Sequence, residues 1–80
     1  MTLDEAVNDL KTKVTAVSAS AVVKVMRVSD EEARVSIYAP ADHLSPLQDA
    51  TREPTIQWLA KDGLDVQVFV YDSATTKPPE

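Results

Sequence analysis

Residues 21–39 read AVVKVMRVSDEEARVSIYA, and this stretch decides the fold. Its first part, residues 21–28, is rich in β-branched side chains and predicts a strand. Residues 29–32 are polar and predict a turn. In residues 33–39 small and branched apolar side chains alternate with larger or polar ones, as in a strand that is buried on one face. The two strands are expected to pair as an antiparallel hairpin with a longer loop.

A helix is predicted before this hairpin, because apolar residues recur at steps of four and three and so share one side of a helix. These residues are Leu3, Val7, Leu10, Val14 and Val17. Thr2 can cap the start of the helix. Asp4 and Glu5 lie in its first turn, where carboxylates suit the positive end of the helix dipole.

A second helix is predicted after the hairpin, with Ser45 as its cap and Pro46 at its first position. Gly63 is the only glycine, and it is expected to end this helix in a left-handed conformation. Pro54 removes an amide donor, so a kink or break is expected between residues 50 and 53. The side chains expected to face the core are Leu44, Leu47, Ile56 and Leu59. For Trp58 two roles stay open, packing at the edge of the core or an exposed anchor for a partner.

Residues 64–71 alternate again and predict a third strand. The order α-β-β-α-β indicates an α+β two-layer sandwich, with both helices on one face of a three-stranded mixed sheet. The pattern does not decide whether the third strand lies beside the first or the second. We expect a single domain over residues 1–72 and a disordered C-terminal tail over residues 73–80, which offers nothing to bury.

This order of elements over residues 3–71 is similar to that of type II KH domains and of the ring-building modules of bacterial secretion systems. The resemblance concerns element order and implies the fold alone. A KH domain clamps nucleotides with a Gly-x-x-Gly loop. This chain contains one glycine, so the resemblance brings no functional residues with it.

Composition limits the functions that the chain can have. Its 80 residues include no cysteine and one histidine, which excludes disulfides, thiolate metal sites and multi-histidine sites, and no cofactor is expected. Self-association is the support that remains open to so small a core. The net charge of −5 argues against nucleic acid as a partner. The chain shows no signal-peptide pattern and no apolar run of the ~20 residues that cross a bilayer, so we expect a cytoplasmic protein without membrane contact.

Two groups of residues contain the side-chain types of chemical sites. Asp42, His43 and Ser45 are those of a hydrolytic triad, but residues so close together at a helix start rarely converge in the required geometry. The three consecutive acids at 30–32 lack the spacing of a calcium loop and are interpreted as a solvated hairpin tip. The sequence therefore predicts a protein that is not an enzyme.

The sheet side opposite the helices carries the main functional signal. Counting alternate positions along the three strands places on it Lys24, Met26, Arg34, Tyr38, Phe69 and Tyr71. Large apolar groups that gather on a surface tend to mark an interaction site. The leading hypothesis is a protein-interaction or assembly domain that uses this face or a strand edge. The alternatives are a single-stranded RNA- or DNA-binding module on the same face, and a face covered within the subunit by the C-terminal tail.

Overall fold

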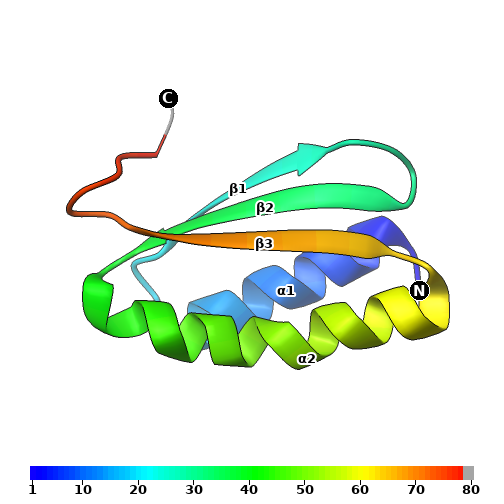
Figure 1. Cartoon of the computed structure of the whole chain (residues 1–80), viewed down its shortest axis with the longest axis horizontal. Helices are drawn as coiled ribbons and strands as arrows, with labels where there is room; N and C mark the ends of the chain where they lie inside the picture. Colours follow the sequence, from blue (N-terminus) through cyan, green and yellow to red (C-terminus); the bar gives the residue numbers. More distant parts are fainter. Residues whose placement is uncertain (79–80) are drawn as a thin grey trace.

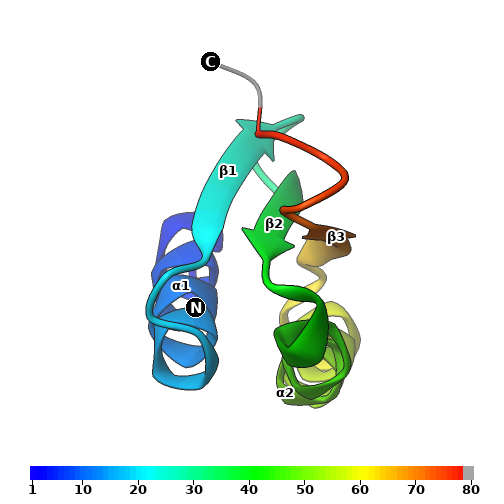
Figure 2. The same cartoon turned by 90° about the vertical axis from the view of Figure 1, so that its left-hand side faces the viewer.

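Two helices and a three-stranded sheet follow one another in the predicted order, in a computed structural model that describes residues 1–78. The elements are α1 (Leu3–Val17), β1 (Val22–Arg27), β2 (Glu32–Ala39), the short 3-10 helix η1 (Ala41–His43), α2 (Leu44–Asp62) and β3 (Asp65–Asp72). Both helices lie on the same side of the sheet, and the other side carries no helix (Figures 1 and 2). The α+β class is therefore confirmed.

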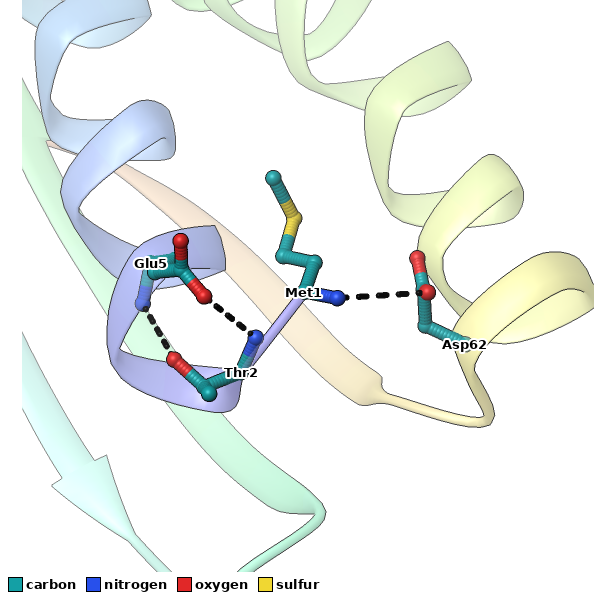
Figure 3. A network of polar contacts seen from close by, with 4 residues as sticks. All are labelled: Met1, Thr2, Glu5 and Asp62. Carbon is teal, nitrogen blue, oxygen red and sulfur yellow. Dashed lines mark hydrogen bonds and ion pairs between the residues drawn. The ribbon is translucent and has the colours of Figure 1, made fainter.

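The start of α1 is fixed by a reciprocal pair of hydrogen bonds. The Glu5 amide donates to the Thr2 hydroxyl at 3.2 Å, and the Thr2 amide donates to the Glu5 carboxylate at 2.9 Å (Figure 3). The backbone bond from Thr2 is the main reason that the pKa of Glu5 lies below its ordinary value. The Met1 amino group lies 3.6 Å from Asp62 at the last residue of α2, so the first residues of α1 sit beside the end of α2.

The central strand of the sheet is β2, with β1 antiparallel on one side and β3 parallel on the other. This arrangement decides the strand order that the sequence left open. Val35 lies opposite Val25 on β1 and opposite Val68 on β3. The helix-facing side chains of β2 are all buried, and with Leu10 and Val14 of α1 and Leu47 of α2 they form the core.

The second helix begins earlier than predicted. It starts at Leu44, directly after η1, and the His43 side chain makes no capping bond. The cap prediction for Ser45 is wrong, because η1 leads straight into α2 and Ser45 becomes an exposed residue of its first turn. Pro46 is tolerated there, because amides of the first turn have no partner within the helix.

Of the kink or break predicted between residues 50 and 53, the break is wrong, since α2 continues through Pro54 (Figure 1). Leu47 and Trp58 are buried on either side of Pro54 and hold both halves of the helix against the sheet. The end of the helix is confirmed. Gly63 adopts a φ of 67°, and its amide donates to the Leu59 carbonyl at 3.2 Å.

Two residues that were predicted to face the core are exposed instead. The exposed fraction is 60% for Ile56 and 55% for Leu59. A helix turns by about 100° per residue, so Ile56 lies about 180° and Leu59 about 120° around the axis from Leu47. Trp58 lies only about 20° from Leu47, and it is the one that is buried. The predicted core face is therefore wrong for Ile56 and Leu59, because Trp58 alone of the three shares the direction of Leu47.

After β3 the chain turns onto the side of the sheet that faces away from the helices (Figures 1 and 2). The Ser73 amide donates to the Ala39 carbonyl at 2.9 Å, and the Thr76 amide donates to the Asp72 carbonyl at 2.8 Å. Within the expected tail, residues 73–78 form a turn followed by irregular chain. Its last two positions, 79 and 80, lie outside the described residues.

Candidate interaction surface on the sheet

The strand register places all six predicted interface residues on the side of the sheet that faces away from the helices, here called the outward face. Directly opposite residues project to the same side of a sheet, and the helix-facing set is fixed by the buried Val35 and Ile37. The outward pairs are Lys24 with Ser36, Met26 with Arg34, Ser36 with Phe69, and Tyr38 with Tyr71.

The aromatic residues of this face are not equally accessible. Tyr38 is only 7% exposed, although it points away from the helices. Its ring stacks on Tyr71 with centroids 5.2 Å apart and an interplanar angle of 22°. The two tyrosines pair near the ends of their strands, and the chain after β3 continues on the side that faces away from the helices (Figure 1). Lys24, Met26 and Phe69 remain exposed.

Polar residues separate the exposed apolar residues of the outward face. Met26 lies beside Arg34, and Phe69 lies beside Ser36, so the two apolar side chains do not meet across β2. At the hairpin end of the face the Gln67 amide donates to Glu32 at 3.0 Å and to Asp65 at 3.2 Å. The outward face is therefore mixed in polarity, with acids as well as bases, and does not form one continuous aromatic patch.

Exposed apolar side chains concentrate instead along the first strand. Residues 1–78 contain eight large apolar side chains that are exposed, and four of them lie within residues 22–28, here called the β1 edge. They are Val22, Val25, Met26 and Val28. They lie on both faces of the strand, because Met26 is 62% exposed on the outward side and Val25 is 39% exposed on the helix side.

The exposure of Val25 follows from the position of α1. A groove of about 390 Å³ separates α1 from β1, with Leu3, Val7 and Val25 among its apolar lining residues. The groove is bridged near the hairpin end, where Arg27 donates to the Asp4 carboxylate at 2.6 Å. Figure 2 shows α1 on the β1 side of the helix layer and α2 on the β3 side, and the groove between α1 and β1 leaves Val25 partly open to solvent.

The backbone of the β1 edge is also free, because β1 is a terminal strand that pairs with β2 alone. The Val28 amide donates to the Glu32 carbonyl at 2.9 Å, and hydrogen-bonded pairs alternate along an antiparallel ladder. The amides and carbonyls of Val23, Val25 and Arg27 therefore point away from β2. Such a row of unpaired groups is a template for another strand.

The three residues with the side-chain types of a hydrolytic triad do not come together. The His43 ring nitrogen Nδ1 lies 2.7 Å from the hydroxyl of Ser18, a buried residue at the end of α1 that the sequence did not connect with it. Asp42 and Ser45 are exposed on the surface of η1 and α2. The His43–Ser18 contact links η1 to the end of α1. Because Ser18 is buried, this contact suits a structural role.

Within residues 1–78 no group of three or more acidic or histidine side chains is placed to hold a metal ion. The helices of this part of the chain are too short or too polar to cross a membrane.

The exposed valines of β1 were not among the predicted interface residues, although the sequence contains a signal for them. Val22 and Val23 are neighbours, as are Val25 and Met26, so apolar side chains point to both faces of this strand. Strict alternation would have indicated a strand with one solvated face. An edge strand that is apolar on both faces has more surface to cover than one helix layer can reach.

Comparisons with models of known protein families, with curated proteins and with solved structures find no match.

Proposed function

We propose that this protein is a non-enzymatic interaction domain that binds another polypeptide along its β1 edge. The observation that carries the proposal is the coincidence of four exposed apolar side chains with an unpaired strand backbone. In strand addition the backbone hydrogen bonds supply affinity, and alternate side chains of the edge supply specificity. The exposed valines and Met26 would provide that apolar contact on both faces of the added strand.

The expected strength of such binding is moderate. Complete burial of a valine or methionine side chain is worth about 1.5–3 kcal/mol, and the four side chains are already partly covered, so together they add roughly 4 kcal/mol. Backbone hydrogen bonds add about 1 kcal/mol each. The three free amides and three free carbonyls of the edge allow six such bonds, and association opposes the total by at least ~4 kcal/mol, so about 6 kcal/mol remains and an affinity of roughly tens of micromolar is expected.

Several features make single-stranded nucleic acid a weaker candidate for the same surface. Bases stack on open aromatic rings, whereas Tyr38 is buried and Tyr71 is half-buried against it. Glu32 and Asp65 lie on the same outward face as Lys24, which weakens attraction for phosphates. These features support protein binding over nucleic-acid binding.

The non-enzymatic part of the proposal is supported by the side chains with catalytic potential. His43 contacts a buried serine, and Asp42 is exposed on the turn beside it. An active site usually brings a base, a nucleophile and an acid together in one pocket, and Asp42, His43 and Ser45 do not come together in this way. A cytoplasmic location is part of the same proposal.

A photo-cross-linking amino acid at Met26 tests the proposed function in the cells that make this protein. The matched control places the same probe at Glu53, which is exposed on α2, the helix that packs under β3 at the other edge of the sheet. We expect a protein cross-link from position 26 that is at least several times stronger than that from position 53. Equal or absent cross-links at the two positions would refute the proposal.

A further inference from the structure

We infer, on the basis of the proposed interaction function, that the partner at the β1 edge is a second copy of this chain. Two β1 strands would pair antiparallel across a two-fold axis, which makes one continuous six-stranded sheet from two three-stranded ones. Contacts of this kind require a surface that complements itself under two-fold rotation. The β1 edge meets that requirement in its backbone, its apolar residues and its charges.

The backbone determines which residues lie at the centre of the pairing. The free amides and carbonyls of the β1 edge belong to Val23, Val25 and Arg27, as the ladder with β2 shows. With the two-fold axis at Val25, this residue faces its own copy and Val23 faces Arg27 of the second copy. Each of these pairs can exchange two hydrogen bonds, so every free backbone group of the three residues gains a partner.

The same register matches the exposed apolar residues with one another. Val22 of one copy lies opposite Val28 of the other, and the two Val25 side chains meet on the helix side of the sheet. On the outward side Lys24 lies opposite Met26, so its aliphatic stem packs on the thioether while its ammonium group stays in water. All four exposed apolar residues of the β1 edge are covered in this arrangement.

Charge repulsion disfavours one of the two neighbouring registers. A shift that places Lys24 on the axis sets two lysines directly opposite each other, and like charges in that position destabilise a sheet. Lys24 is exposed and makes no ion pair within residues 1–78. Lys24 therefore destabilises the register in which it lies on the two-fold axis, and it is compatible with the register centred on Val25.

The helix layer adds a second match of charges. Asp4 lies level with Arg27, to which it is bonded, and Lys11 follows Asp4 by seven residues on the same groove of α1. Seven helical residues span about 10 Å, whereas Arg27 and Val25 are about 7 Å apart along the strand. The axis through Val25 thus passes between Asp4 and Lys11. Two-fold rotation brings Asp4 of one copy toward Lys11 of the other.

The size of the contact sets the concentration at which the dimer forms. A stable interface typically buries about 800 Å² on each partner. A short strand edge with the flank of one helix is expected to bury an area at the low end of the sizes seen for specific interfaces. A dimer that dissociates at roughly tens of micromolar is expected. The mass measured by sedimentation should therefore rise from 8.7 kDa toward twice that value between dilute and concentrated samples.

Cysteine cross-linking tests the register directly, because the natural chain contains no cysteine. In the proposed dimer the Val25→Cys side chains face each other at a Cα separation of about 5.5 Å, which a disulfide can span. We expect Val25→Cys to form disulfide dimers under mild oxidation, at least tenfold faster than Lys24→Cys. Faster dimer formation by Lys24→Cys would overturn the proposed register.

A charge variant tests the same contact without oxidation. Val25→Lys places two like charges on the axis and should weaken self-association at least tenfold. The control Ile56→Lys, at a more exposed residue of α2, should leave self-association unchanged. Circular dichroism of both variants verifies that they fold.

The failure of self-pairing and the failure of the proposed function give different results. A monomeric mass at every concentration, with no Val25→Cys dimer, would overturn self-pairing. Cross-links from Met26 to a different protein would then still support the interaction function. The absence of both signals would overturn both proposals.

Discussion

Replacement of Pro54 by alanine should stabilise this protein, although Pro54 is half-buried. A proline inside a helix costs about 3 kcal/mol, because its ring clashes with the preceding turn and its missing amide leaves the carbonyl of Ala50 without a partner. Alanine removes two half-buried carbons, a loss of about 0.8 kcal/mol. It also makes the unfolded chain more flexible, which lowers the stability by a further ~0.4–1 kcal/mol. The net gain is about 1.5 kcal/mol.

Urea unfolding and thermal melting measure this gain, with an expected rise of Tm of roughly 6–12 °C for a domain of this size. Pro46→Ala is the matched control, because Pro46 lies in the first turn of α2, where no helical carbonyl accepts its amide. That control should be neutral or destabilising by up to ~1 kcal/mol. If Pro54→Ala is no more stable than Pro46→Ala, the continuous path of α2 through position 54 is wrong.

Three further predictions test the packing and the ends of the helices. Leu47→Ala should lower the free energy of unfolding by about 2–5 kcal/mol, whereas Ile56→Ala should change it by less than ~0.5 kcal/mol; similar losses in urea unfolding would contradict the observed phase of α2. Gly63→Ala should cost about 1–2 kcal/mol in the same assay. A methyl group there meets no atom within 4 Å, so only the backbone at φ 67° is strained, and an unchanged stability would exclude that conformation. NMR titration of Glu5 should give a pKa below its ordinary value of 4.5, and the Thr2→Ala variant should move it upward. Because the folded pKa is lowered, the stabilisation by this carboxylate is present above pH 4.5 and is lost as the pH falls through the folded pKa; a value at or above 4.5 would contradict the capping bond.

The parts of the fold that could be predicted from the sequence are those that local patterns determine. The apolar spacing and the Thr2 cap define α1, and a left-handed glycine ends α2 at Gly63. The position of β3 beside β2 could not be predicted, because it depends on how α2 packs across the sheet. In the second half of α2 the apolar residues point in different directions, and the angle of each residue from Leu47 shows that Ile56 faces solvent.

The candidate surface shows the same division. Alternation along the strands correctly predicts that Lys24, Met26 and Phe69 project away from the helices. It does not predict accessibility, because accessibility depends on neighbours that are distant in sequence. Tyr38 is covered although it points outward, and Val25 is open although it points toward α1. The exposure of Val25 depends on the groove between α1 and β1, which no local sequence pattern predicts.

The two neighbours of β2 differ in how far along the chain they lie, and this difference orders the folding reaction. The hairpin of β1 and β2 closes a short loop, so it can form in microseconds. The contacts between β2 and β3 span the whole of α2, and contacts between distant segments form slowly. During synthesis the backbone groups of β2 that face β3 are therefore expected to stay unpaired until β3 has been made. In that interval the nascent chain is most prone to pair with the wrong strand.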